Sequence, residues 1–231
     1  MSALALFCLV WTVALYFASK ALYRRHPRIW FAPVVVVPAL TVALLLCAHI
    51  PYSVYTADTH WLIWMAGPAT VAFAVPIYEY RHMVLRHWLS LGIGIGVGMS
   101  VALASAFLLA YALHFDPEVS RSLLVRSVST PFAVVVAGET GGSPQLVALF
   151  TIVTGLTGMI AGDVVLALLH LRSSIAQGAS FGVSAHGFGT ARARERDTEE
   201  GVVASLTMIL SGVLMILAGP TLVQWIGTLA I

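Results

Sequence analysis

Charged residues are scarce in this sequence. Of its 231 residues, only 10% are Asp, Glu, Lys or Arg, while 59% are hydrophobic. Soluble proteins average about 25% charged residues, and a soluble domain of this length leaves roughly a third of its unfolded-chain surface in water. The composition therefore excludes a disordered chain and an ordinary soluble enzyme, and it predicts an integral membrane protein in a lipid bilayer. A net charge of +2 gives no indication of nucleic acid as a partner.

Patterns for metal, disulfide and hydrolase chemistry are also missing. The two cysteines, Cys8 and Cys47, both lie in apolar stretches, without the spacing of a metal site or a disulfide framework. The histidines show no H-E-x-x-H spacing. A Ser/His hydrolase would need a nucleophile elbow on a soluble α/β frame, which this chain does not provide. We therefore expect no metal, no cofactor and no enzymatic activity.

Apolar runs long enough to cross a bilayer recur along the chain. A membrane-spanning helix needs about 20 apolar residues. The basic residues between Lys20 and Arg28 follow the first run, which favours an uncleaved first helix with this segment in the cytoplasm. We predict an all-α, polytopic helical bundle. Its six candidate spans are residues 3–19, 31–50, 61–79, 88–113, 144–171 and 202–229.

Two of these spans contain residues that modify a helix. In the third, Pro68 and Pro76 interrupt the hydrogen-bond ladder, so we expect a broken helix there, with Thr70 between the two prolines. The fourth contains overlapping G-x-x-x-G pairs, which let a neighbouring helix approach closely. We favour this packing role over a direct role in a substrate path. The pairs are Gly92/Gly96 and Gly94/Gly98.

Two further stretches are too rich in small polar residues and glycine to span as plain helices. They are residues 127–142, whose only apolar run is short, and residues 173–194. Irregular backbone at membrane depth is tolerated only inside protein or against a water-filled cavity. We therefore expect these stretches to be broken or re-entrant helical segments and to hold the functional site.

The chain also shows a possible internal repeat. A proline-broken segment followed by a glycine-studded span occurs in residues 61–114 and again in residues 127–171. This arrangement is a sequence pointer to a secondary transporter, and the charges leave open whether the copies are inverted. We predict N-terminal helical spans in residues 1–55 and a membrane domain in residues 56–231, with residues 173–231 as its C-terminal segment.

Two isolated carboxylates are candidates for proton or ion coupling. Glu139 either binds a cation, a proton or an arginine, or reaches water in a loop. Asp163 lies in an otherwise uncharged span, where an ionisable group costs a few kcal/mol and should face a cavity or a partner. A tie to another helix is the alternative role for Asp163.

Polar residues in the two stretches are candidates for binding an anion. His186 can bind a carboxylate, titrate near neutral pH or brace irregular backbone. Arg192 can hold a carboxylate with two hydrogen bonds, although the charged run around it is typical of a solvated face. Ser127 and Thr130, which precede Pro131, can donate to an anion or cap freed amides.

These stretches resemble motifs of the LrgB/CidB family of bacterial membrane proteins. The strings that carry the resemblance are G-P-A-T-V-A-F-A-V-P-I-Y at 67–78, S-V-S-T-P at 127–131, G-G-S-P at 141–144 and S-A-H-G-F-G-T-A-R-A at 184–193. Asp163 matches no motif of the family. The resemblance implies substrate-binding positions at Ser127, Thr130, Pro131, Gly141, Gly142, Ser184, His186, Gly189, Thr190 and Arg192.

What this family is described as doing supplies further expectations. Its members are described as holin-like or antiholin-like modulators of murein hydrolase activity and autolysis, acting with a small LrgA/CidA-type membrane partner. Related plastid sequences are described as glycolate/glycerate translocators, and bacterial members have been linked to pyruvate uptake. The resemblance therefore implies a multi-pass protein of the bacterial inner (cytoplasmic) membrane with such a partner. We also expect a homo-oligomer, and specifically a dimer.

Two functions agree with these features. The first is secondary transport of small monocarboxylates such as glycolate, glycerate or pyruvate, coupled to protons through His186 or Glu139. The second is holin-like regulation of autolysis through oligomerisation or the small partner. This second function needs no substrate site, and its glycines would serve helix association. Pore formation alone needs fewer spans than this chain offers, which favours transport.

Overall fold

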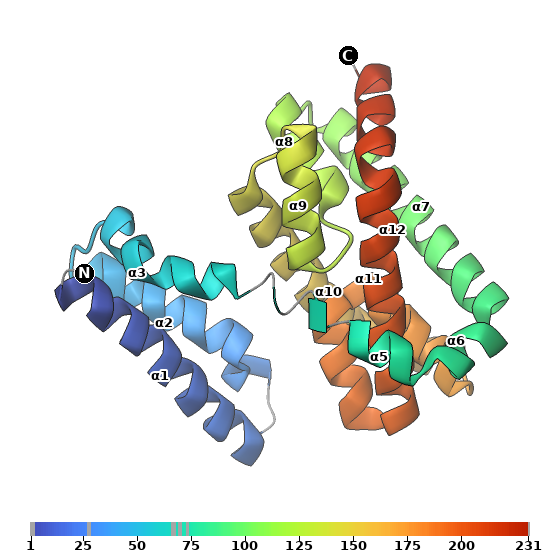
Figure 1. The fold of residues 1–231 in the computed structure, drawn as a ribbon, viewed down its shortest axis with the longest axis horizontal. Helices are drawn as coiled ribbons and strands as arrows, with labels where there is room; N and C mark the ends of the chain where they lie inside the picture. The colour runs from blue at the N-terminus through green and yellow to red at the C-terminus, as the bar shows by residue number, and fades with distance from the viewer. Residues whose placement is uncertain (1–2, 27–28, 66–67, 69–70, 73, 231) are drawn as a thin grey trace. The chain divides into compact units, whose positions relative to one another are not determined.

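Helices make up all the regular structure that the computed structural model of the chain describes. The chain forms two compact units, Met1–Ala69 and Thr70–Ile231 (Figure 1). The described residues are 3–26, 29–65, 68, 71–72 and 74–230.

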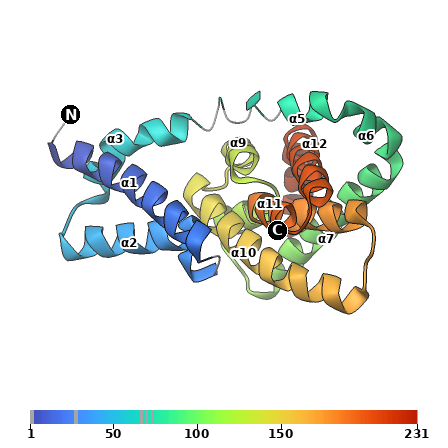
Figure 2. The same ribbon diagram turned by 90° about the horizontal axis from the view of Figure 1, so that it is seen from below.

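In the described part of the N-terminal unit the chain forms helices α1 (Ala3–Arg25), α2 (Pro33–Cys47) and α3 (Tyr52–Trp64), with a 3₁₀ turn at Ile29–Phe31. Helix α1 contacts both of the others, and Figure 2 shows it beside α2 and α3. Small side chains on one face of α1 make the close contact possible. They are Ala5, Cys8 and Ser19.

The C-terminal unit is built around one long helix, α12, which packs against α7, α8, α9 and α11. The first half of α12 is almost entirely buried, and Figure 1 shows α12 standing beside α9 and α7. The helices of this unit are α5 (Ala74–Glu79), α6 (Arg81–Arg86), α7 (Trp88–Ala112), α8 (Pro117–Val125), α9 (Thr130–Thr140), α10 (Pro144–Leu169), α11 (Ser174–Arg196) and α12 (Thr198–Ala230).

Among the described residues, four helices are long and apolar enough to cross a membrane: Ala3–Arg25, Trp88–Ala112, Pro144–Leu169 and Thr198–Gly227. They confirm a multi-pass, all-helical membrane protein.

The other two predicted spans contain shorter helices. In the predicted span 31–50, helix α2 has only 15 residues, about 22 Å, which is less than the hydrocarbon core of about 30 Å. In the predicted span 61–79, α3 ends at Trp64, and Pro76 lies in the short helix α5. Thr70 lies outside the described residues.

The glycines of α7 make less contact than predicted. At Gly98 a Cβ atom would meet Val183 of α11, in agreement with a close helix contact. At Gly92, Gly94 and Gly96 no described atom lies within 4 Å of the Cβ position, so the predicted packing role of these three glycines stays a prediction. A G-x-x-x-G pattern marks a helix face that permits close packing, but it does not say whether a helix of the same chain occupies that face.

Close packing between helices occurs instead on α10. A Cβ atom at Gly158 would lie 2.8 Å from the carbonyl oxygen of Ser184, and one at Gly155 would lie 3.3 Å from that of Ala185. Both carbonyls belong to the middle of α11. The backbone of α11 therefore lies close against α10 at Gly158, and the ring of Phe188 fills the space over Gly155.

Helix α11 is broken at a single residue. His186 has φ 50° and ψ −129°, inside a segment that is otherwise helical. The chain turns back so sharply there that a Cβ atom at Gly189 would collide with the carbonyl of Phe181. Eight residues of straight helix would separate the two by about 12 Å. The predicted irregular stretch 173–194 is thus two short helices with one break, and its glycines permit close packing instead of unwinding the chain.

We predict that Gly158→Ala destabilises the protein by about 1–3 kcal/mol, because the new methyl group must displace the α11 backbone. Thermal unfolding in detergent micelles, followed by tryptophan fluorescence, measures the change. The matched control is Gly94→Ala, which adds the same methyl group where nothing lies within 4 Å and should not lower the Tm. An unchanged Tm for Gly158→Ala would contradict the backbone contact.

Candidate functional site

The two stretches expected to hold the site meet inside the C-terminal unit. His186, at the break of α11, lies against the backbone of Ser127, in the turn between α8 and α9. Both residues are buried, with exposed fractions of 3% for His186 and 6% for Ser127. Two breaks that are almost sixty residues apart in the sequence therefore form one site.

Several polar atoms at this site are buried without a hydrogen-bond partner in the described part of the chain. They are Nδ1 and Nε2 of His186, Oγ of Ser127 and Oγ1 of Thr151. Thr151 lies on α10 one turn before Gly155, on the face that contacts α11. An unpaired buried polar group costs about 1–3 kcal/mol. A concentration of them marks a place where a polar ligand or water completes the hydrogen bonds.

Arg126 supplies the positive charge next to these atoms. Its Nη1 donates a hydrogen bond to Oγ1 of Thr154 on α10, at 2.8 Å. No carboxylate of the described residues lies within 4 Å of its guanidinium. Burial lowers the pKa of Arg126, but an arginine stays charged at neutral pH. The site therefore contains a half-buried cation whose partner is a neutral hydroxyl.

The imidazole of His186 is neutral at physiological pH in this structure. Burial lowers the pKa of His186 to about 4; the backbone of Ser127 acts in the opposite direction, and the charge of Arg126 lowers the pKa further. This pKa lies below the neutral range in which one of the predicted roles of His186 has the imidazole titrate, and that role stays a prediction. A carboxylate beside Arg126 would oppose both unfavourable effects.

The backbone of His186 is strained. Other histidines also have a φ near 50°, but they lie at or just beyond helix ends: His49, His114 and His170. His186 instead interrupts a helix and has a ψ of −129°. Such strain costs about 1–3 kcal/mol and persists only where the surroundings enforce it. Oγ1 of Thr190 helps by donating to the carbonyl of His186 at 2.9 Å.

Two helix N-termini begin at the site. Helix α9 begins at Thr130, with Pro131 in its first turn, directly after the break at Ser127. The second half of α11 begins directly after His186. Free amides and the helix dipole give such ends a partial positive charge that favours anions. Together with Arg126 and the unpaired hydrogen-bonding atoms, they form an environment suited to a small anion.

Arg192 and Asp163 lie in a separate ion-pair network. Nε of Arg192 lies 2.8 Å from Oδ2 of Asp163, and Nη1 of Arg196 lies 3.3 Å from Oδ1 of the same carboxylate. Nε of Arg196 also lies 3.2 Å from Oε2 of Glu200. The network ties α10 to the end of α11 and the start of α12. Arg192 thus pairs with a carboxylate of the protein, and Asp163 occupies the position of a helix tie.

The remaining candidates of the first stretch shape the turn after α9. Gly141 ends α9 with φ 75°, the left-handed conformation that glycine adopts without strain. Gly142 packs on α8, where its Cβ position lies 3.2 Å from Oγ of Ser122. Glu139 is exposed in the last turn of α9, as expected of a carboxylate that reaches water. Two prolines were expected to break the predicted span 61–79. Pro76 lies in α5, which packs on α12, while Pro68 belongs to the N-terminal unit.

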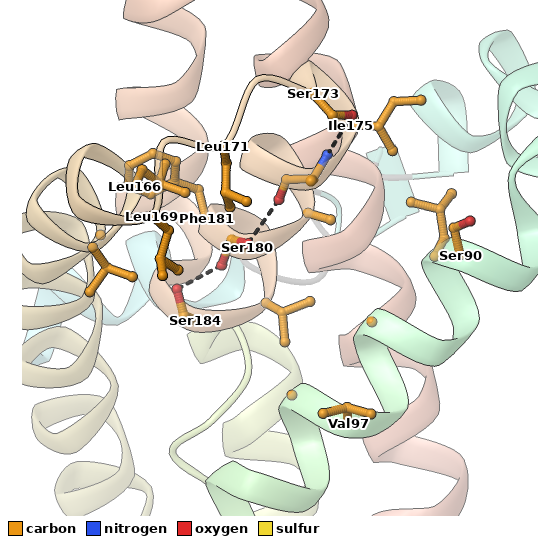
Figure 3. Close-up of a pocket in the computed structure, with 18 of the residues that line it drawn as sticks. Ser90, Val97, Leu166, Leu169, Leu171, Ser173, Ile175, Ser180, Phe181 and Ser184 are labelled. Atoms are coloured by element: carbon orange, nitrogen blue, oxygen red, sulfur yellow. Dashed lines mark hydrogen bonds between the residues drawn. The ribbon is translucent and has the colours of Figure 1, made fainter.

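Ser184 lines a different feature, a groove of about 950 Å³ between α7, α10 and α11 (Figure 3). Neither His186 nor Thr130 lines it. Its walls are mainly apolar, and two of its hydroxyls on α11 already donate hydrogen bonds within the helix. Ser184 donates to the carbonyl of Ser180 at 2.7 Å, and Ser180 donates to that of Ala176 at 2.8 Å. The groove therefore offers little to an anion. The G-A-S-F-G string around Ser180 lies within the helix and forms no nucleophile elbow.

Comparison with known proteins places this chain in a family. The family model described as the LrgB-like family matches residues 12–225. The chain belongs to the LrgB-like family. This confirms the resemblance of its motifs to LrgB/CidB proteins.

Three relatives illustrate the extent of the match. The chain is 36% identical to the uncharacterized protein YwbG of Bacillus subtilis, over 93% of this chain and 95% of that protein. It is 33% identical to YxaC of the same organism, over 96% of each. It is 31% identical to the holin-like protein CidB of Staphylococcus aureus, over 95% of this chain and 96% of that protein. No solved structure matches the chain.

Sequence reasoning about this LrgB-like chain did not identify three residues of the site. Arg126 belongs to a mixed charge cluster before the first stretch, where it looks like a surface residue. Thr151 and Thr154 lie in a regular apolar span. The available signal was their spacing, because Thr151 precedes Gly155 and Gly158 on one helix face.

We predict that Asp163→Asn lowers the free energy of unfolding by about 1 kcal/mol or less, because the ion pair with Arg192 is about one-third exposed and exposed pairs contribute little. A double-mutant cycle with Arg192→Gln, measured by thermal unfolding in micelles, isolates the pair. The two changes together should cost less than the sum of the single ones. Strict additivity would contradict the interaction.

Proposed function

We propose that this LrgB-like protein is a secondary transporter of small monocarboxylates such as glycolate, glycerate or pyruvate. The observation that carries the proposal is the meeting of two helix breaks, at Ser127 and His186, around buried polar atoms without partners. Many secondary transporters bind their substrate between discontinuous helices, with helix N-termini directed at its anionic group. The internal repeat proposed from the sequence agrees with such an architecture.

The donors at the site match the atoms of a small hydroxy or oxo acid. The N-terminal ends of α9 and of the second half of α11 favour its carboxylate. Hydroxyls of Ser127 and Thr151 both donate and accept hydrogen bonds, so either can pair with a hydroxyl or keto oxygen.

Proton coupling follows from the charges around His186. With the site empty, burial and the charge of Arg126 keep the imidazole neutral at pH 7. A bound carboxylate supplies the opposite charge and raises the pKa of His186, so a proton enters together with the anion. Glu139, the other residue expected to couple protons, is exposed and is the weaker candidate.

We predict that purified protein in liposomes takes up labelled glycolate, glycerate or pyruvate, and that Ser127→Ala and His186→Gln reduce the uptake at least about tenfold, because each removes a hydrogen bond to a charged ligand. Arg192→Gln is the control, since its guanidinium pairs with Asp163, and it should keep most of the uptake. No uptake of any of these acids by wild-type protein, under either a proton or a sodium gradient, would overturn the proposal.

We predict that binding consumes protons. At pH 6 the free protein has a neutral His186, whose pKa of about 4 lies below the solution pH. Adding pyruvate to a weakly buffered sample should therefore raise the pH as the imidazole takes up a proton. In proteoliposomes, an inward proton gradient should accelerate uptake. His186→Gln should abolish the pH change, and an identical pH change in this variant would assign the proton to another group.

A second candidate function is the holin-like or antiholin-like regulation of murein hydrolase activity and autolysis, with a small LrgA/CidA-type partner. It is favoured by the name of the CidB relatives and by three α7 glycines, Gly92, Gly94 and Gly96, whose Cβ positions have no described atom within 4 Å. Those glycines suit a homodimer or a partner helix in the inner membrane. Deleting the gene together with that of its partner, and finding altered autolysis without a carboxylate phenotype, would favour this function over transport.

A further inference from the structure

The charge at the site has no counter-ion. Arg126 is half-buried, and the one hydrogen bond that its guanidinium makes to a described residue goes to the hydroxyl of Thr154. Burying a charge is costly unless it is paired. We infer that Arg126 binds the carboxylate of the transported anion and limits the site to anions with a single charge. The inference rests on the proposed transport function and adds to it the residue that recognises the substrate.

Two other arginines that contact α10 do not fit this role. Arg192 contacts Asp163 and Glu195, while Arg196 contacts Asp163 and Glu200. Their positive charges are thus neutralised by carboxylates of the protein. Arg126 instead keeps free donors, because a guanidinium has five N–H groups and the described residues use one of them.

The position of Arg126 suits a ligand at the two helix breaks. It directly precedes Ser127, whose backbone touches His186, and its charge is close enough to lower the pKa of that imidazole. Thr154 holds one end of the guanidinium from α10 and so acts as a positioning residue. A carboxylate between Arg126 and His186 would receive hydrogen bonds from the remaining guanidinium donors and from the unpaired atoms around it.

The arrangement of the cationic groups sets the substrate class. A carboxylate between Arg126 and His186 uses the charge of the guanidinium and, once the proton has been taken up, that of the imidazole. A second carboxylate of the same molecule would lie beyond both groups and would be buried without a partner, which is unfavourable. Monocarboxylates should therefore bind, and dicarboxylates of similar size should be rejected.

The test measures uptake of labelled pyruvate by full-length protein in liposomes, together with the rise in Tm that pyruvate produces in micelles. Arg126→Gln should raise the KM about tenfold or more and remove the Tm rise. Arg126→Lys keeps the charge without the planar fork, so its KM and its Tm rise should lie between those of wild type and those of Arg126→Gln. Thr154→Val should raise the KM with little change in kcat. Arg121→Gln, on the same helix α8, is the matched control and should behave as wild type.

Competition by unlabelled acids provides a test that needs no variant, in case Arg126→Gln does not fold. Glycolate and lactate should inhibit pyruvate uptake by wild-type protein, whereas malonate and succinate should not. Equal inhibition by dicarboxylates would overturn the charge limit, and an unchanged KM in folded Arg126→Gln would overturn the role of Arg126. Either result, in a protein that still takes up pyruvate, leaves the proposed transport intact. Absence of uptake by wild-type protein overturns both.

Discussion

The contact of the α11 backbone with α10 is the constraint on which the site depends. A Cβ atom at Gly158 would lie 2.8 Å from the carbonyl oxygen of Ser184, and the ring of Phe188 lies directly against Gly155. This contact lies directly beside the break at His186, where the chain adopts a conformation that a free helix would avoid. A strained turn needs surroundings that leave it no alternative, and backbone packed on both sides of the break provides them. The glycines of α10 therefore hold the break in place, and the break creates the site.

The arginines near α11 fall into two groups, one at the end of the helix and one beside the break. At the end of α11 every arginine with a described ion pair is neutralised, through Asp163, Glu195 or Glu200. At the middle of α11 a single arginine faces neutral groups. The first group ties three helices together, and its positive charges are neutralised by carboxylates of the protein. The second leaves its potential available to an anion, because helix N-termini and a guanidinium point the same sign of charge at one place.

The sequence predicted the helical membrane architecture and the two breaks, because proline, glycine and serine leave a clear local pattern. His186 and Ser127 lie together as parts of these breaks, and local pattern was enough to single out each one. It was not enough for Arg126, which precedes Ser127 but looks like one more charge of a mixed surface cluster, or for Thr151, which lies in a regular apolar helix that only the fold brings to α11. For the same reason, the sequence could not predict whether the glycines of α7 or those of α10 pack against another helix of the chain. Both helices offer a packing face, and the tertiary structure decides which face is used.

The cost of the site argues for a ligand. A regulator that works by helix association would gain nothing from a buried histidine with two unpaired nitrogens, two unpaired hydroxyls and a cation without a counter-ion. Apolar residues at these positions would pack without any such cost. An anion that enters the site supplies the missing charge and hydrogen bonds at once, and it does so reversibly, as a transporter requires. Transport and control of autolysis then need not be alternatives, because a protein that moves an acidic metabolite can make lysis depend on that metabolite.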